Sequence, residues 1–334
     1  MSLTQPVTTK PSTLAHIQEP VREDLERVRE ELRRIVRANL GMTDEVNQYL
    51  LLMRGKMFRP TLVLLADRIC GGDGDPAVTL AAAVELVHLA TLVHDDAVDH
   101  SVLRRGLPTV NALWTHQVAI IMGDYLYSRS VTELTRVGNL DVLRCLAIAA
   151  NEMSLGEMRQ LTSYDALDFS EEDYYALIAA KTASLMAASC EIGALATGPD
   201  PRCSALRRFG HNLGMAFQIA DDLLDYTGTE AVTGKPTGHD LRQRKVTLPL
   251  IGAMKVAGAR ERKGIRRFFS TRDPSDEEIA GLIELVEELG GLEYARERAE
   301  RYAGWAAAAL EDLEAGSAKQ ALLTSIAYVV DRRR

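Results

Sequence analysis

Apolar residues recur with the period of a helix along most of the chain. Leu25, Val28 and Leu32 follow one another at intervals of three and four, as do Leu282 and Val286. This spacing places them on one face of a helix. Most of the periodic segments run for about 20 residues or more, whereas a strand typically takes about 3 to 10. The pattern predicts an all-α protein. Gly-, Pro- and polar-rich breakers separate the segments at 71–76, 104–111, 197–202, 227–240 and 271–278.

Some central segments are apolar on most of their faces rather than on one. Such helices are expected to be surrounded by other helices. Because no repeat or low-complexity tract marks a linker, we predict one helical domain over 19–334, preceded by a flexible arm over 1–18. The longest irregular stretch, 227–240, is a candidate lid or binding loop. The segments apolar on most faces are 80–98, 142–158 and 185–196.

Composition and charge narrow the possible partners and location. Hydrophobic residues make up 46% of the chain and aromatics only 5%, which is typical of helical proteins. The net charge of -8 argues against a nucleic-acid partner. We find no uninterrupted apolar run of the roughly 18 to 20 residues that cross a bilayer, so we expect no transmembrane segment and a cytoplasmic protein. The cysteines, which lack metal-site or redox spacing and fit a reducing compartment, are Cys70, Cys145, Cys190 and Cys203.

The first candidate for chemistry is the acidic run DDAVD at 95–99. On a helix Asp95 and Asp99 are one turn apart and share a face, whereas Asp96 lies about 100° round the axis. The run ends an apolar helix, where the helix dipole disfavours negative charge, so a bound cation would account for it. Taken alone, the run is equally compatible with a solvated acidic helix end.

A second acidic run, DDLLD at 221–225, repeats the pattern after another apolar segment. Gln218, Asp221, Asp222 and Asp225 form one stripe over two turns. Two such stripes in a helical bundle must face water, bases or metal, because an unpaired buried charge costs several kcal/mol. Oxygen ligands without His or Cys favour Mg²⁺ or Mn²⁺, which usually share their coordination with phosphate. The repetition therefore predicts a ligand that contains phosphate.

Basic residues that could complete such a site lie beside predicted loops. Most Lys and Arg side chains at loop edges are simply solvated, which is the ordinary interpretation of these residues. Lys181 differs, because it lies within an apolar segment. An unpaired ammonium group there would be destabilising, so Lys181 needs a nearby anion. The candidates are Lys56, Arg59, Arg104, Arg105, Lys181 with Thr182, Lys235 and Lys245.

Five segments together resemble the trans-isoprenyl diphosphate synthases, in the same order and at comparable separations over about residues 20 to 330. The segments are GKMFRP, ELVHLATLVHDDAVDHSVLRRGLPTVNA, KTASL, FQIADDLLDYTG and GKPTGHDLRQRKVTLPL. The resemblance implies a single-domain bundle of long helices around a central apolar cavity. It also implies a magnesium-dependent prenyltransferase that condenses isopentenyl diphosphate with an allylic diphosphate and releases pyrophosphate.

The resemblance also implies roles for individual residues. Three Mg²⁺ ions, or Mn²⁺ in their place, would be held by Asp95, Asp99 and Asp221, with Asp222 and Asp225 assisting and Asp96 counted among the catalytic acids. The allylic diphosphate or its metals would be contacted by Arg104, Lys181, Thr182, Gln218, Lys235 and Lys245. The isopentenyl diphosphate would be contacted by Lys56, Arg59, His88 and Arg105. Met57 and Arg244 depart from the pattern, because the family often has a basic residue at the first position and Gly at the second.

Product length is expected to depend on residues one to two turns before Asp95. Ala90 and Thr91 would line the tunnel for the growing chain, and in this family a bulky aromatic there stops elongation early. Ala90 is small, which predicts a product longer than farnesyl, in the hexaprenyl to decaprenyl range. It could equally be a helix-packing residue.

Three other interpretations stay open. One is a geranylgeranyl diphosphate synthase, another a class I terpene cyclase, and the third a partner subunit of a two-chain synthase. The intact DDLLD run favours a synthase over a cyclase, and two intact runs favour a catalytic chain over a partner subunit. The resemblance also implies a homodimer.

Overall fold

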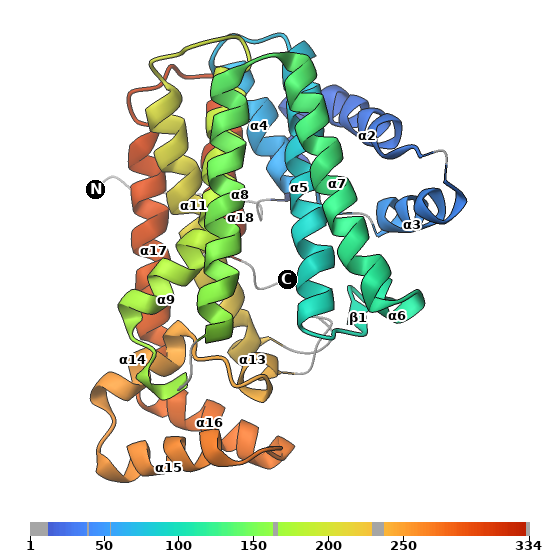
Figure 1. The fold of residues 1–334 in the computed structure, drawn as a ribbon. Coiled ribbons are helices and arrows are strands. Elements are labelled where there is room, and N and C mark those ends of the chain that lie inside the picture. The colour runs from blue at the N-terminus through green and yellow to red at the C-terminus, as the bar shows by residue number, and fades with distance from the viewer. Residues whose placement is uncertain (1–12, 39, 54, 163–165, 229–236, 332–334) are drawn as a thin grey trace, which may run out of the picture.

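The predicted all-α architecture is confirmed in the computed structural model, which describes residues 13–38, 40–53, 55–162, 166–228 and 237–331. Long helices stand side by side, and one short hairpin follows the helix that carries the first acidic run (Figure 1). The elements are α1 (Leu14–Gln18), η1 (Glu19–Val21), α2 (Arg22–Val36), α3 (Gly41–Leu52), α4 (Phe58–Ile69), α5 (Asp75–Val98), β1 (Leu103–Arg104), β2 (Leu107–Pro108), α6 (Val110–Leu113), α7 (His116–Val137), α8 (Leu140–Thr162), η2 (Ala166–Asp168), α9 (Glu171–Ile178), η3 (Ala179–Ala183), α10 (Ser184–Leu195), α11 (Cys203–Thr227), α13 (His239–Arg242), α14 (Leu248–Val256), α15 (Ala259–Ser270), α16 (Asp276–Glu288), α17 (Gly291–Ala309) and α18 (Ser317–Val330).

The helices that are apolar on most faces form the centre of the bundle. Helix α5 packs against α2, α4 and α7, and α10 packs against α4, α8 and α11. Leu80, Leu86 and Cys190 are fully buried there. Helix α5 and the stretch 171–195 are long and apolar enough to cross a membrane, but 67% and 61% of their apolar windows are buried inside the protein. Their composition is therefore that of core helices.

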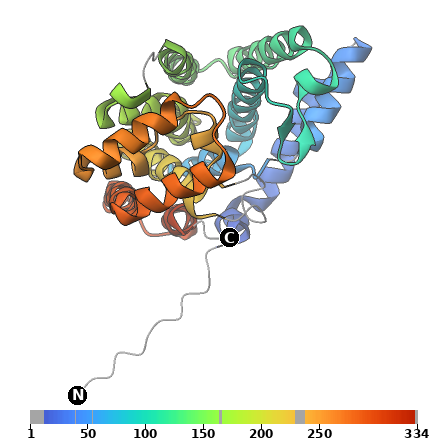
Figure 2. The ribbon, with the colours of Figure 1, turned by 90° about the horizontal axis from the view of Figure 1, so that it is seen from below.

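A second apolar cluster joins α9, α11 and α14 to α17 at the lower end of the bundle in Figure 1. Helix α17 packs along α11 and also against α14 and α16. Seen from below, α15 and α16 lie across this end of the molecule (Figure 2). The cluster thus supports the end of α11, where the second acidic run lies.

The folded chain begins earlier than the predicted arm allows. Residues 14–18 form α1, which packs against α18. Ile17 is fully buried, because its apolar side chain fills the space between these helices and the core. The part of the predicted arm over 1–12 lies outside the described residues, as does most of the candidate lid at 229–236.

The expectation that 142–158 is surrounded by other helices is wrong for this chain by itself. Helix α8 packs on α7, α9, η3 and α10, and the side that carries Val142, Leu146 and Met153 is buried. On its outer side Ile148, Leu155 and Met158 are 44%, 52% and 57% exposed, and Ile121 on the neighbouring α7 is 64% exposed. Apolar side chains on both faces of a helix with one covered side leave an apolar surface, which is a feature of interaction sites.

The hairpin of β1 and β2 brings two basic residues back to the end of α5. Its two-residue turn is formed by Arg105 (φ 53°) and Gly106 (φ 77°), both in the left-handed region that such turns require. The Thr109 hydroxyl and the Asn111 amide both donate to the Ser101 carbonyl, at 2.6 and 2.9 Å. These bonds fix the hairpin beside DDAVD.

Candidate active site

A cavity of about 1720 Å³ lies between the central helices and is lined by both acidic runs. The structure brings most of the predicted site residues to its wall. Ala90 and Asp96 are not among the lining residues, and Lys235 lies outside the described residues. The predicted residues that line it are Lys56, Arg59, His88, Thr91, Asp95, Asp99, Arg104, Arg105, Lys181, Thr182, Gln218, Asp221, Asp222, Asp225 and Lys245.

The first acidic run divides its carboxylates between the cavity and the interior. Asp95 and Asp99 face the cavity, as their one-turn spacing predicted. Burial raises the pKa of Asp95 to about 6, although the Lys181 ammonium opposes the shift. Asp96 is only 5% exposed, and its Oδ2 accepts a hydrogen bond from Arg104 Nε at 2.7 Å. Asp96 therefore anchors the hairpin arginine.

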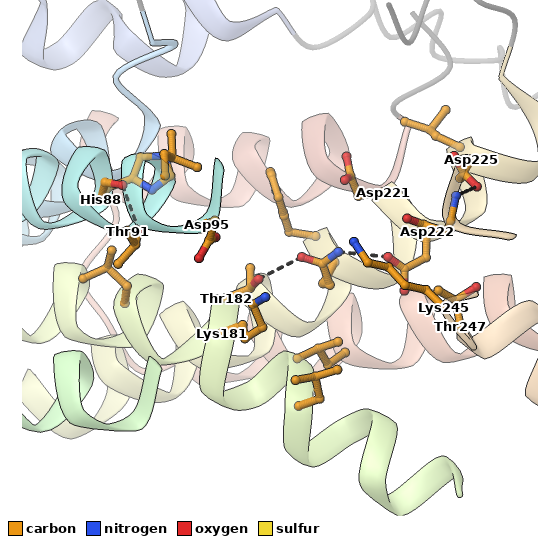
Figure 3. A pocket seen from close by; sticks show the side chains of 18 of the residues that line it. His88, Thr91, Asp95, Lys181, Thr182, Asp221, Asp222, Asp225, Lys245 and Thr247 are labelled. Atoms are coloured by element: carbon orange, nitrogen blue, oxygen red, sulfur yellow. Dashed lines mark hydrogen bonds between the residues drawn. The ribbon is translucent and has the colours of Figure 1, made fainter. Parts of the chain in front are cut away.

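The second acidic run gives its three carboxylates different surroundings. Asp221 lines the cavity, and Figure 3 shows it on the side opposite Asp95. Asp222 is 5% exposed and accepts from Tyr174 Oη at 2.5 Å and from Gln218 Nε2 at 2.9 Å. Burial and the nearby Asp240 carboxylate raise the pKa of Asp222 well above its usual value.

Asp225, the last acid of the second run, holds the start of a short helix. Its two carboxylate oxygens accept from the backbone amides of His239 and Asp240, at 3.1 and 2.9 Å. These amides are the first two of α13, so Asp225 acts as a cap contributed from another helix. The cap ties α11 to the segment that leads to Lys245.

Lys181 reaches the cavity from a π-helical turn. Residues of η3 (Ala179–Ala183) form wider i to i+5 bonds, a feature often found at functional sites. The Lys181 ammonium forms an ion pair with Glu157 and donates to Gln160 Oε1 at 2.9 Å. Thr182 donates to Gln218 Oε1 at 2.8 Å, which links η3 to the second acidic run. Glu157 is thus the anion that the position of Lys181 predicted.

A separate basic group lines the cavity near α4 and the first half of α5. Arg59 Nη1 lies 3.1 Å from His88 Nε2. Burial lowers the pKa of His88 well below its usual value, and Arg59 and Arg105 lower it further, so the ring is neutral and Nε2 accepts. Arg105 Nη1 donates to the Met53 carbonyl at 3.1 Å. Lys56 lies over the Tyr328 ring at 5.8 Å from its centroid.

The two positions that depart from the sequence pattern are both in the left-handed region. Met57 has φ 52° and Arg244 has φ 61°. A glycine adopts such angles without strain, so the glycine that the resemblance leads one to expect at position 244 would suit this backbone. Arg244 Nη1 donates to the Phe268 carbonyl at 2.6 Å and its guanidinium stacks on that ring, so its side chain supports the loop beside Lys245.

The comparisons with known proteins agree with this geometry. A sequence model of the polyprenyl synthetase family matches residues 41–286. The chain belongs to the polyprenyl synthetase family. It is 39% identical over 312 residues to heptaprenyl diphosphate synthase component 2 of Geobacillus stearothermophilus, covering 93% of this chain and 96% of that protein. It is 36% identical over 314 residues to the geranyl-diphosphate-specific all-trans-nonaprenyl-diphosphate synthase of Rhodobacter capsulatus, covering 94% and 96%.

Solved structures show the same fold. The crystal structure of a polyprenyl synthase from Caulobacter crescentus, complexed with calcium and isoprenyl diphosphate, matches with a TM-score of 0.92 at 34% identity and covers 98% of this chain and 100% of that one. The predicted isoprenoid synthase fold is confirmed, and this polyprenyl synthetase is a prenyltransferase, as the resemblance implied.

The donor set of this polyprenyl synthetase fits a divalent metal ion that is shared with a phosphate ligand. Among the described residues no three acidic, His or Cys side chains converge closely enough to hold an ion alone. Asp95 and Asp99 stand on one wall and Asp221 on another, so each offers only part of a coordination sphere. Mg²⁺ characteristically binds through one or two carboxylates plus phosphate oxygens and water. The residues therefore fit the metal.

Of the two predicted chain-length residues in this polyprenyl synthetase, only one reaches the cavity. Thr91 lines it and donates to the His88 carbonyl at 2.8 Å (Figure 3). Ala90 is 3% exposed and lies within the core cluster instead. Adjacent helical residues point about 100° apart, so one of the pair can face the tunnel while the other packs against a neighbouring helix.

The sequence analysis missed three residues at or beside the cavity. Glu157 and Gln160 on α8 bind Lys181, and Glu85 on α5 lines the cavity together with the basic group of Lys56, Arg59 and Arg105. Glu85 precedes His88 by three residues and Asp95 by ten, so helical spacing from those two could have found it. Glu157 has no such signal, because its partner is distant in sequence.

Proposed function

We propose that this chain condenses isopentenyl diphosphate with an allylic diphosphate to make a trans-polyprenyl diphosphate and pyrophosphate. One observation carries the proposal. A single cavity joins two separate anion sites, one formed by Lys181 with the acidic runs and the other by Lys56, Arg59 and Arg105. A condensation of two diphosphates needs such a pair of sites within reach of each other.

The residues around the first site suit the departure of pyrophosphate. When held by Asp95, Asp99 and Asp221, Mg²⁺ supplies positive charge against the negative charge that grows as the allylic C–O bond breaks. We expect three ions, with Mn²⁺ as a substitute. Lys181, fixed by Glu157 and Gln160, adds a positioned cation to the same side of the cavity. Arg104 is oriented by the hydrogen bond that it donates to Asp96.

The second site holds isopentenyl diphosphate in this proposal. Its double bond attacks the allylic carbon, and a proton leaves the new chain, which requires no side-chain nucleophile. Neutral His88 orients Arg59 by accepting its hydrogen bond. Apolar side chains such as Leu92 and Phe217 also line the cavity and would exclude water from the allylic cation.

We infer a product in the hexaprenyl to decaprenyl range. Supporting this range, two relatives over 30% identical are named for heptaprenyl and nonaprenyl products. The small Thr91 side chain leaves the wall open one turn before Asp95. Thin-layer analysis of the dephosphorylated products measures the length, and a product no longer than geranylgeranyl would contradict the inference.

We also propose a homodimer in the cytoplasm, formed through the outer faces of α7 and α8. Ile121, Ile148, Leu155 and Met158 give these helices an apolar surface that a second copy would cover. Light scattering should give twice the monomer mass, and Leu155→Glu should reduce it to the monomer mass. The relative named component 2 makes a two-chain assembly the alternative, and activity of the purified chain alone separates the two.

The activity test uses the pure protein with labelled isopentenyl diphosphate and each of dimethylallyl, geranyl, farnesyl and geranylgeranyl diphosphate. Label should enter longer products only when Mg²⁺ is present. No incorporation from any primer would overturn the proposal. Pyrophosphate release from an allylic diphosphate without isopentenyl diphosphate would instead indicate a terpene cyclase.

A further inference from the structure

Glu85 is an acid buried within the basic group that is proposed to bind isopentenyl diphosphate. It lies on α5 one turn before His88, lines the cavity, and is only 4% exposed. A Cβ atom added at Gly55 would lie 3.0 Å from Glu85 Oε1 and 3.6 Å from Arg105 Nη1, so carboxylate and guanidinium flank the same point. A carboxylate is unexpected here, because it repels the diphosphate that the surrounding cations attract.

Among the described residues, Glu85 is not held to its basic neighbours by an ion pair. In the described part of the chain it forms no ion pair within 4.0 Å, whereas Asp96, Glu133 and Glu157 each pair with a cation. Burial raises the pKa of Glu85, and the charges of Arg59 and Arg105 oppose that rise. Its influence on the site is therefore through its charge rather than through a bond that positions an arginine.

The negative charge of Glu85 bears on where the diphosphate of the lengthened chain lies after each condensation. In each condensation the C–O bond of the allylic diphosphate breaks and a C–C bond to isopentenyl diphosphate forms, and the new chain then gives up a proton to the departing pyrophosphate. The pyrophosphate that leaves comes from the Lys181 site. The lengthened chain keeps the diphosphate that entered with isopentenyl diphosphate, which still occupies the site of Lys56, Arg59 and Arg105.

A second round requires this diphosphate to move to the Lys181 site. If the site of Lys56, Arg59 and Arg105 bound it too tightly, the lengthened chain would stay there and the next isopentenyl diphosphate could not enter. We propose that Glu85 weakens diphosphate binding at Lys56, Arg59 and Arg105, so that the lengthened product transfers to the aspartate site between rounds. The inference rests on the proposed function and adds a residue that controls repeated elongation.

The test is Glu85→Gln, which removes the charge and keeps the shape. The KM for isopentenyl diphosphate should fall about 3- to 10-fold, because one repulsive charge is lost from the site. In rapid quench with one allylic primer, the first condensation should keep its rate within about twofold, whereas later rounds should slow at least about 5-fold. Products one unit longer than the primer should then accumulate.

Glu287→Gln is the matched control, since Glu287 is exposed on α16 and does not line the cavity. Glu287→Gln should leave the KM for isopentenyl diphosphate and the rates of the first and later condensations unchanged. Glu85→Asp keeps the negative charge but moves it one methylene closer to the backbone. Its KM for isopentenyl diphosphate and its rates of later rounds should lie between those of Glu85→Gln and of the unaltered protein. It also provides the same test if Glu85→Gln does not fold.

Two results would overturn the inference. A higher KM for isopentenyl diphosphate together with a slower first condensation would mean that Glu85 positions the arginines. Unchanged kinetics in Glu85→Gln would mean that its charge has no effect. If the unaltered protein gives no first condensation, the proposed function fails instead, and the two failures are thereby distinguished.

Discussion

The two acidic runs have nearly the same sequence but different surroundings. In DDAVD the first and last acids, Asp95 and Asp99, face the cavity, and the middle one pairs with an arginine. In DDLLD Asp222 bonds Tyr174 and Gln218 and Asp225 caps α13, whereas Asp221 lines the cavity opposite Asp95.

The difference follows from where each helix ends. Helix α5 ends at Val98, one residue before the last acid of the run, and the tight hairpin returns Arg104 to the middle acid. Helix α11 continues to Thr227, so its run is covered by α9 and α13, which supply the partners of Asp222 and Asp225. The same DDxxD spacing thus leaves the outer acids of the first run facing the cavity, whereas in the second run Asp222 and Asp225 also hold neighbouring segments.

The largest effect should come from the acids that face each other across the cavity. Asp95→Ala and Asp221→Ala should each lower pyrophosphate release about 100-fold or more, since each removes part of the metal coordination. Because burial disfavours the ionised form of Asp95, removing this carboxylate should not lower the Tm of the metal-free protein. Asp312→Ala, at an exposed site, is the control; a loss below tenfold in either variant would contradict these roles.

Asp96→Ala should mainly reduce stability. It removes the carboxylate that pairs with Arg104 and leaves a partly buried guanidinium without that partner, which should cost about 2 to 3 kcal/mol in the free energy of unfolding. Urea unfolding measures the loss. In a double-mutant cycle with Arg104→Met the two losses should be strongly non-additive. Additive losses would show that Asp96 acts independently of Arg104.

Tyr174→Phe should have a smaller effect, confined to the second run. The variant removes the hydroxyl that donates to Asp222, so unfolding should become easier by about 1 to 2 kcal/mol. Activity should fall less than tenfold, because Asp221 keeps its place. Tyr175→Phe on the same helix loses a bond to Glu171 instead and should leave the kinetics of the allylic substrate unchanged.

Thr91→Phe should change product length with little change in rate, because α5 carries the tunnel wall as well as the first run. A ring at this position would obstruct the cavity one turn before Asp95, so shorter products are expected on thin-layer plates. Ala90→Phe should instead lower Tm by overpacking the core. Shortening by Ala90→Phe alone would place the tunnel on the other side of α5.

The sequence predicted the helical fold and the acidic part of the cavity lining because both depend on helical spacing. The apolar period indicated the helices, and the stripe of Gln218, Asp221 and Asp225 was visible from intervals of three and four. The roles within that stripe could not be predicted, since they depend on partners such as Tyr174 and the amides of α13 that only the fold brings near. The π-helical turn at Lys181 has no local signal.

The exposed face of α8 was missed for a related reason. An apolar pattern indicates burial but does not distinguish a covering helix of the same chain from one of another chain. Leu155 and Met158 are therefore exposed here although the pattern predicted that they would be covered.

Binding of Mn²⁺ in the presence of inorganic pyrophosphate, followed by electron paramagnetic resonance, tests most directly whether the second run divides into a metal ligand, Asp221, and a supporting acid, Asp222. Asp221→Asn should weaken Mn²⁺ binding about 100-fold or more, because a ligand is lost. Asp222→Asn should weaken it by about tenfold at most, since asparagine resembles the protonated form that burial favours and only supporting bonds change. Equal losses in the two variants would contradict the account.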